Sequence, residues 1–390
     1  MGFLQTIDQI FVSGTGAVVR WVERLAGRPA ATAAGMLIII LAIVVVAPLA
    51  MAYITWLERK TLARIQNRIG PNRVGLFGLL QPIADLVKLV TKEDIVPAAA
   101  DRVVHLLAPI LAVVPAFLVL AAIPYGRNMA ALDLDIALIY LFAISGFSVV
   151  AIFMGGWASR NKFSILGAMR AVAQMVSYEI PLVLSAVPVV MIAGTLSLTG
   201  IVEAQSGFLG LDWFVLRPWG LAGFLLFFVA SISEVNRTPF DIPEAESEIV
   251  AGFHTEFSGF KFALFFMAEY LGMLAMAFLG ATLFLGGWNG PPILPSYAWL
   301  ALKTFLLVLT FIWLRGTFPR LRVDQLMGFA WKFLLPMALL NILATGLWYH
   351  LPSAPARWLS NAAILVPSYW VLARFAAPWP AERRSYRFAP

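Results

Sequence analysis

The chain has 390 residues, of which 61% are hydrophobic and 13% are charged, and its formal net charge is +7. Soluble globular domains usually carry about a quarter charged residues, so this composition, with a mean hydropathy of +0.85, excludes an ordinary soluble protein. The sequence therefore predicts an all-α, polytopic membrane protein.

Stretches of roughly 20 mostly apolar residues, the length that a helix needs to cross a bilayer, recur along the chain. They predict a transmembrane bundle of eight core spans and a ninth near the C-terminus, with amphipathic helices at the interface. The expected spans are residues 34–54, 104–124, 136–157, 178–198, 217–233, 261–285, 298–314, 331–349 and 358–376. We expect an N-terminal extension (1–33), a core membrane domain (34–350) and a C-terminal extension with the ninth span (351–390).

Lys and Arg are distributed unevenly among the loops between these spans. The loops after the first, third and seventh spans are rich in them, whereas the loops after even-numbered spans hold few. Because cytoplasmic loops are enriched in Lys and Arg, we predict that the N-terminus lies outside and the C-terminus inside.

The chain has no cysteine and only three histidines, His105, His254 and His350. Iron–sulfur clusters need thiolate ligands, and the histidines lack the spacing of metal ligands. The sequence also has no Walker loop, dinucleotide fingerprint or zinc-protease motif. We therefore expect no metal or covalently bound cofactor in this chain, and a function inside a larger assembly or in moving something across the membrane.

The first polar segment runs from Trp56 to Glu93 and is divided by the turn-forming sequence GPNRVG. Beyond this turn, apolar residues recur at helical spacing on one face, and the opposite face carries Gln81, Asp85, Lys88 and Lys92. This pattern predicts an amphipathic helix that either lies at the membrane interface or packs beneath a partner. Asp85 favours the partner, because an anionic inner leaflet attracts Lys and Arg rather than an acid.

Two carboxylates lie within expected spans. Glu179 stands two residues before Pro181 at the start of the fourth span, and Glu269 lies in the middle of the sixth. An ionisable group at membrane depth is costly and therefore indicates a function. Glu179 is also consistent with a helix end at the interface, whereas Glu269 requires a function or a buried partner.

The loop from Ser231 to Phe262 contains the sequence PFDIPEAESEIVAG and concentrates negative charge. Its carboxylates are Glu234, Asp241, Glu244, Glu246, Glu248 and Glu256. Within the segment only Arg237 and Lys261 can neutralise them. Closely spaced like charges and partial burial both raise the pKa of a carboxyl, so such a cluster can hold and pass protons. Phe and Ile residues alternate with the acids, which disfavours the alternative of a fully solvated loop.

The segment after the seventh span is cationic. Its basic residues Arg315, Arg320, Arg322 and Lys332 surround Asp324. A basic loop of this kind is consistent with a topological anchor on the cytoplasmic side.

Four long blocks occur in order along the chain. They are GLLQPIADLVKLVTKE with the preceding ERKTLARIQNRIGPNRVG, then GWASRNKFSILGAMRAVAQMVSYEIP, SEVNRTPFDIPEAESEIVAGFHTEFSG and RGTFPRLRVDQLM. These blocks resemble the signatures of the membrane subunit called H, or 1, of proton-pumping NADH-quinone oxidoreductase, respiratory complex I. The resemblance covers residues 35–350.

The resemblance implies a subunit of a proton-translocating oxidoreductase, of the translocase class, in the bacterial cytoplasmic (inner) membrane. It implies that this chain forms the membrane-side wall of a quinone tunnel and couples quinone reduction to proton translocation. The substrate would be ubiquinone or menaquinone, while NADH, FMN and iron–sulfur clusters would be bound by partner subunits. The implied partners are peripheral quinone-site subunits, antiporter-like membrane subunits and lipid, with no nucleic acid.

The resemblance also implies two sets of site residues, with no catalytic residue and no metal ligand among them. The quinone tunnel would be lined or braced by Arg59, Asp85, Arg237, Arg315 and Arg320. The proton path would contain Glu179, Glu234, Asp241, Glu244, Glu246, Glu248 and Glu269.

Two other functions remain open. The related membrane subunit of energy-converting hydrogenases has no quinone, and the complete ERK…RIGPNRVG and PFDIPEAESE blocks disfavour it. A free-standing ion transporter is the second alternative, but the sequence shows no internal repeat of the kind found in many secondary transporters.

Overall fold

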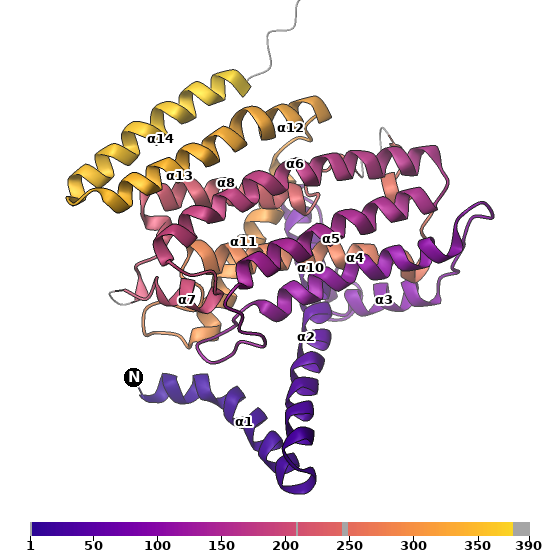
Figure 1. Cartoon of the computed structure of the whole chain (residues 1–390). Helices are drawn as coiled ribbons and strands as arrows, with labels where there is room; N and C mark the ends of the chain where they lie inside the picture. Colours follow the sequence, from indigo (N-terminus) through magenta and orange to yellow (C-terminus); the bar gives the residue numbers. More distant parts are fainter. Residues whose placement is uncertain (1, 208–209, 244–248, 377–390) are drawn as a thin grey trace, which may run out of the picture.

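The computed structural model describes residues 2–207, 210–243 and 249–376 (Figure 1). These residues form helices and loops, and within them the only β pairing is an isolated bridge between Pro124 and Ala130. The all-α polytopic fold predicted from the sequence is confirmed. The longer helices are α1 (Gly2–Ala26), α2 (Arg28–Ile65), α3 (Gln81–Thr91), α4 (Arg102–Ala122), α5 (Ala137–Ala158), α6 (Lys162–Ala193), α8 (Pro218–Glu234), α10 (Gly259–Phe284), α11 (Ser296–Thr317), α13 (Leu335–His350) and α14 (Ala354–Ala376).

Short helical elements connect or extend these helices. They are η1 (Leu76–Gly78), α7 (Leu198–Glu203), η3 (Phe214–Leu216), η4 (Gly252–His254), α12 (Val323–Phe329) and η5 (Ala330–Leu334). The last is a single π-helical turn that joins α12 to α13 into one continuous helical segment.

Seven helical segments of the described chain are long and apolar enough to cross a membrane: α2, α4, α5, α6, α10, α11 and the segment Val323–His350. The helix α8, with 17 residues, is shorter but apolar. The expected ninth span forms α14, which is not among the seven. Its Asn361 is buried and donates a hydrogen bond to the carbonyl of Ala344 in α13 at 3.1 Å.

Four of the nine expected spans agree closely with the observed helices, whereas α2 extends beyond the expected 34–54 at both ends. The helices α4, α5, α8 and α10 begin and end within two residues of the expected positions. The fourth span differs, because α6 begins at Lys162, well before the expected start at residue 178. The polar residues before 178 therefore belong to a helix, and Pro181 and Pro188 lie inside it. Proline is tolerated in transmembrane helices because neighbouring groups satisfy the freed backbone.

The bundle is arranged as a row of helices with further helices behind it. Figure 1 shows α4, α5, α6, α13 and α14 side by side, with α10 and α11 behind them. The helix α2 projects out of the bundle, and α1 folds back from it at Gly27. Only the part of α2 near its C-terminal end is packed among α4, α10 and α11.

Local sequence signals determine where the central helices begin and end. Asp101 caps α4 by accepting hydrogen bonds from the backbone amides of Val103 and Val104. Asn161 caps α6 in the same way, and Gly194 ends that helix in the left-handed conformation with φ of 70°. These are the capping residues that sequence rules favour.

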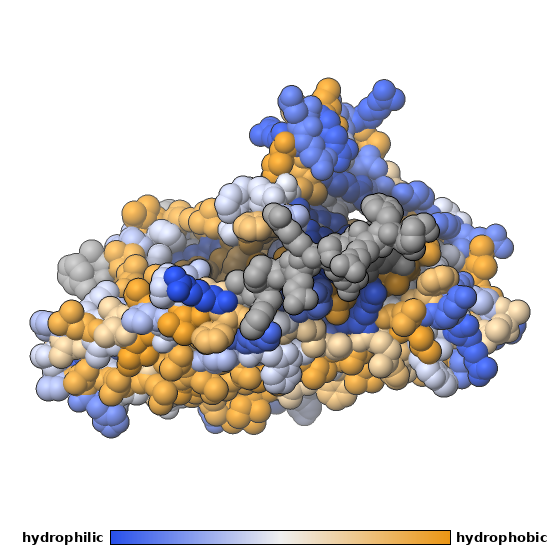
Figure 2. Space-filling view, turned by 90° about the horizontal axis from the view of Figure 1, so that it is seen from above, coloured by the Kyte–Doolittle hydropathy of each residue, from blue (hydrophilic) through white to orange (hydrophobic). Residues whose placement is uncertain are grey.

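Close helix contacts and an apolar exterior are both typical of membrane proteins. A Cβ added to Gly156 of α5 would lie 2.3 Å from the Cβ of Ala168 in α6, so only glycine permits this approach. Figure 2 shows hydrophobic residues over most of the flank of the bundle, with hydrophilic residues on a lobe that projects from it and at both ends of the flank.

Candidate functional site

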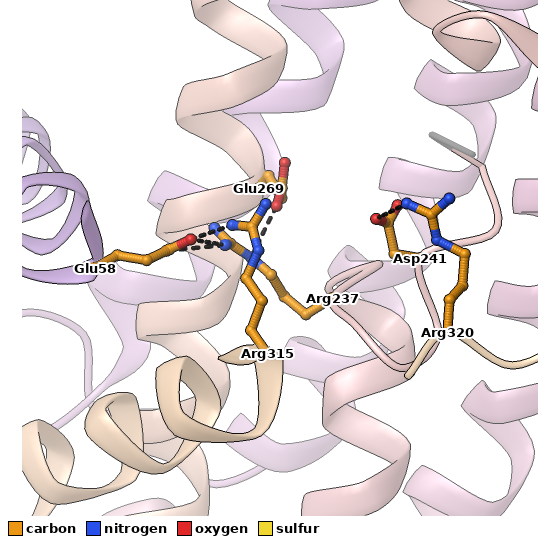
Figure 3. A network of polar contacts seen from close by, with 6 residues as sticks. All are labelled: Glu58, Arg237, Asp241, Glu269, Arg315 and Arg320. Atoms are coloured by element: carbon orange, nitrogen blue, oxygen red, sulfur yellow. Dashed lines mark hydrogen bonds and ion pairs between the residues drawn. The ribbon is translucent and has the colours of Figure 1, made fainter. Parts of the chain in front are cut away.

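Six charged side chains form two ion-pair groups at one end of the bundle (Figure 3). Four of them converge in one group: Glu58 of α2, Arg237 after α8, Glu269 of α10 and Arg315 near the end of α11. Asp241 and Arg320 form the second group, in the loops that follow α8 and α11. With three acids and three arginines, the six side chains are neutral as a set.

Glu58 and Arg237 are the centre of the four-residue group. The Arg237 Nη1 donates to both Glu58 carboxylate oxygens at 2.9 Å, and Arg315 Nη1 donates to Glu58 Oε1. On its other side, Arg237 Nε lies 2.8 Å from Glu269 Oε1, in an ion pair without aligned hydrogen-bond geometry. The side chains of Glu58 and Arg237 are each only 3% exposed. The two acids thus hold one buried arginine between α2 and α10.

The guanidinium of Arg237 remains charged in this environment. Burial alone would lower the pKa of Arg237, but the carboxylates of Glu269 and Glu58 raise it by more. The ring of Tyr270 adds a cation–π contact, with its centroid 4.1 Å from Arg237 Cζ. Arg237 therefore acts as a fixed positive charge that links the two acids.

Asp241 lies in a loop that hydrogen bonds position on two sides. Gln174 of α6 donates to the carbonyls of Ser233 and Phe240 at 2.8 Å, which ties this loop to the helix. The Asp241 carboxylate then accepts a hydrogen bond from Arg320 Nη2 at 2.9 Å. Burial raises the pKa of Asp241, and Arg320 only partly offsets this effect.

Arg59 and Asp85 form a third pair, next to the four-residue group along α2. Arg59 Nη1 lies 2.5 Å from Asp85 Oδ2, and Gln81 donates to the other oxygen at 3.1 Å. Burial would raise the pKa of Asp85, but the hydrogen bonds from Arg59 and Gln81 outweigh it and lower that pKa. The amphipathic helix predicted here is confirmed as α3, and Asp85 lies on its polar face.

A cavity of about 120 Å³ lies between α4, α5, α8 and α10. Its walls are mainly apolar, and its polar groups come from Glu234, Glu269, His254, Ser145 and Ser148, with Asn236 at the loop after α8. The cavity is large enough for several water molecules. Because burial lowers the pKa of His254 to about 4, this imidazole is neutral at neutral pH. Glu269 thus contacts Arg237 and also lines a space that can hold water.

Glu179 lies on α6 beside this cavity. It is partly exposed on the surface of the chain, and it is close enough to Glu234 for the two carboxylates to repel each other. A Cβ added to Gly146 of α5 would lie 3.4 Å from Glu179 Oε1. Glu179 therefore occupies the middle of a long helix rather than a helix end at the interface.

The structure brings together most, but not all, of the residues singled out from the sequence. Glu244, Glu246 and Glu248 lie outside the described residues. The acids and cations of the loop 231–262 also pair with residues outside it. Asp241 pairs with Arg320, and Lys261 pairs with Asp94 at 2.8 Å. The remaining acid of that loop, Glu256, accepts a hydrogen bond from Asn161.

Sequence reasoning missed Glu58 and Tyr270. Glu58 stands in the sequence ERK, where it is the only acid in a basic cluster, and that isolation is the signal that could have found it. No comparable signal marks Tyr270, which directly follows Glu269. Within the described ranges, no group of three or more His, Cys, Asp or Glu side chains is placed to hold a metal ion.

Comparisons with known proteins agree on one family. A sequence model of the family described as NADH dehydrogenase matches residues 38–346, from within α2 to within α13. The chain is 51% identical over 311 residues to the H subunit of NADH-quinone oxidoreductase from Dehalococcoides mccartyi strain CBDB1, and the match covers 80% of this chain and 84% of that protein. It is 49% identical over 327 residues to the H 2 subunit of the same enzyme from Syntrophobacter fumaroxidans, and this match covers 81% of this chain and 97% of that protein.

Proposed function

The chain belongs to the NADH dehydrogenase family, and from this membership and the geometry of the site we propose that it couples quinone reduction to proton translocation. Like the relatives that are named as H subunits of NADH-quinone oxidoreductase, it acts as a multi-pass membrane subunit of that enzyme. We infer that it forms the membrane-side wall of the quinone tunnel. In this proposal the electrons come from redox centres in partner subunits and the N-terminus lies outside, an orientation that the distribution of Lys and Arg favours.

One observation carries the proposal: a series of charged residues, joined by ion pairs and by one step along α2, leads from α3 to the cavity. Asp85 contacts Arg59, whose chain neighbour Glu58 contacts Arg237, and Arg237 contacts Glu269. Glu269 lines the cavity together with Glu234. A change of charge near α3 can therefore alter the balance of charge in the cavity through this series of ion pairs, in which Arg59 and Glu58 are chain neighbours.

The surroundings of Asp85 suit a quinone, which has a small polar head and a long apolar tail. A ligand site of this kind needs apolar walls with a few polar groups. The face of α3 opposite Asp85 exposes Ile83, Leu86, Val87 and Val90, each more than half exposed. In our proposal this face and α2 guide the tail, while Arg59 and Asp85 border the head.

The chemistry of the substrate gives these residues their roles. Reduction of a quinone to a quinol takes up two electrons and two protons, so negative charge develops at the head before the protons arrive. Arginines beside the head stabilise that charge. When Arg237 or Arg315 is drawn toward it, Glu58 and Glu269 lose part of their compensating positive charge, and Glu269, which lines the cavity, can then take up a proton. Glu269 then exchanges protons with Glu234 through the cavity, and Glu234 exchanges them with Glu179.

A photoreactive quinone analogue tests the quinone site in the intact purified complex. We expect labelling of this chain within residues 50–100 or 231–262, and competition by excess quinone. Labelling confined to the loops at the opposite end of the bundle, or to other subunits alone, would contradict the proposed tunnel.

Proton coupling is tested separately with Glu234→Gln, which preserves the shape of the side chain but cannot ionise. The variant should assemble and pass electrons from NADH to an artificial acceptor, yet lose most of its quinone-dependent proton pumping. A normal proton yield in Glu234→Gln and in the double variant with Glu246→Gln would contradict the relay.

A further inference from the structure

A buried lysine lies at the end of the bundle opposite the acidic site. Lys303, in the first half of α11, is 5% exposed. Its Nζ donates to the backbone carbonyls of Leu285, Gly287 and Asn289 at 2.6, 2.8 and 2.5 Å. Three acceptors at these distances need three protons, and only the ammonium form of lysine supplies them. The group is therefore a buried cation.

The cation site is built by the turn that follows α10. Gly286 and Gly287 have φ of 74° and 51°, and this left-handed turn points the carbonyls of alternate residues toward Lys303. A Cβ added to Gly286 would lie 2.5 Å from Trp213 Cδ1, so the turn packs directly on that indole. The same indole covers the ammonium, with its ring centroid 4.3 Å from Nζ. Further hydrogen bonds hold the turn in place, including one of 2.6 Å from Asn289 to the carbonyl of Val202.

Among the described residues no acid forms an ion pair with Lys303, whose ammonium is held by backbone carbonyls and indole rings instead. An unpaired buried charge is costly in a membrane protein and therefore indicates a function. The carbonyls at the C-terminal end of α10 partly compensate the charge, because this end of a helix dipole is negative. The three carbonyls of Leu285, Gly287 and Asn289 are also the groups that would bind a mobile cation, but the ammonium of Lys303 already occupies them.

The position of Lys303 relative to the cavity suggests what this charge does. The cavity extends along α10 as far as Met276, and Leu285 lies about 13 Å further along the helix. The intervening residues Ala277, Ala281 and Phe284 are completely buried. The one side-chain hydroxyl in this stretch of α10, that of Thr282, is also buried and donates to the carbonyl of Leu279 at 2.8 Å. Beyond the cavity there is thus a closely packed section, whose one hydroxyl is hydrogen-bonded within α10, and then a fixed positive charge.

We propose that Lys303 is an electrostatic seal, a tethered cation that prevents protons and other cations from leaking between the carboxylate cavity and the membrane face at the far end of the bundle. Fixed positive charges and helix dipoles exclude cations from membrane pores in the same way. The inference rests on the proposed function, because a seal is needed only where the cavity carries protons.

The test uses the intact complex reconstituted into liposomes, with an imposed pH gradient and no NADH. We expect Lys303→Met to raise the passive proton leak by about threefold or more, because the barrier charge is removed. Lys303→Arg keeps the charge and should retain the low leak of the wild type. Lys332→Met, at an exposed lysine, is the matched control and should also behave as the wild type. With an uncoupler present, quinone reduction by Lys303→Met should stay close to the wild-type rate.

Three results would overturn the seal. The first is an assembled Lys303→Met complex whose proton leak equals that of the wild type. The second is an equal proton leak in Lys303→Arg and Lys303→Met. The third is that Lys303→Arg assembles while Lys303→Met and Lys303→Gln both fail to assemble. The second result would show that the increased leak comes from altered packing rather than from loss of charge. The third would show that the ammonium is needed for folding or assembly rather than as a barrier. Because the leak is measured without turnover, these results are independent of the Glu234→Gln pumping experiment, whose failure would refute the proposed function instead.

Discussion

Neutralising Glu58 is the most direct test of the ion network. Glu58→Gln removes one negative charge from a set of six side chains that is otherwise neutral, and it leaves Arg237, 3% exposed, with Glu269 as its one remaining acid among the described residues. Removing one partner of a buried ion pair typically destabilises a protein by 3–5 kcal/mol, so we expect a loss of about 4 kcal/mol. An entropy of unfolding of about 0.8 kcal/mol per kelvin for a chain of this length converts this loss to a fall of about 5 °C in the melting temperature.

The assay is thermal unfolding of the purified complex, followed by tryptophan fluorescence and by native gel electrophoresis. The exposed Glu93→Gln is the control for the same chemical change. In the double variant Glu58→Gln with Arg315→Gln, the network is neutral again, because Arg237 and Glu269 remain as a pair. We expect the double variant to recover about 2 kcal/mol relative to the sum of the two single effects. A melting temperature of Glu58→Gln equal to that of the control, or purely additive effects, would refute charge balance as the basis of this site.

Three further predictions concern neighbouring parts of the site. Asp85→Asn should raise the apparent KM for quinone at pH 7 by about three- to fivefold, because Asp85, with its lowered pKa, is ionised there and holds Arg59 by a partly exposed pair; an unchanged quinone titration would count against this. The pKa of Asp241 is raised in the folded state, so its contribution to stability is present below the unfolded pKa and lost as pH rises through the folded pKa. The melting temperature of the wild type minus that of Asp241→Asn should therefore fall as the pH rises above about 4, the usual pKa of an aspartate, and a rising difference would show the opposite linkage. Gly167→Ala places a Cβ 2.5 Å from the η4 backbone and should lower the amount of assembled complex on native gels through overpacking of about 1–3 kcal/mol, whereas Gly272→Ala, which meets nothing within 4 Å, should not.

The spans were predictable because hydropathy and helix length are local properties of the chain. The start of α6 was not, since Arg170 and Gln174 made residues 162–177 resemble a polar loop. In the structure Gln174 is buried, and its amide donates to the carbonyl of Ser233 near the end of α8 and to that of Phe240 in the loop that follows. A polar residue inside a helix can thus serve a distant segment, and hydropathy does not register such a role.

The site was only partly predictable, for a similar reason. The concentration of acids near Asp241 is visible in the sequence, but the arginine that pairs with Asp241 is 79 residues away. Glu58 directly precedes Arg59 and Lys60 in the chain, so the segment is interpreted as a basic cluster and the acid is overlooked. Its partners, Arg237 and Arg315, lie 179 and 257 residues further along, so that only the folded arrangement of α2, α8, α10 and α11 reveals them.

That separation has a consequence for biosynthesis. Glu58 enters the membrane with α2, but Arg237 is translated 179 residues later, which at 5–20 residues per second is about 10–35 s. During this interval the nascent chain holds an acid that has no permanent cation, and α2 cannot settle into its final position. The N-terminal helices therefore reach their final packing only after the last third of the chain has been synthesised. A chain that terminates before Arg315 would leave Glu58 only partly neutralised, and such a fragment is expected to be degraded rather than incorporated.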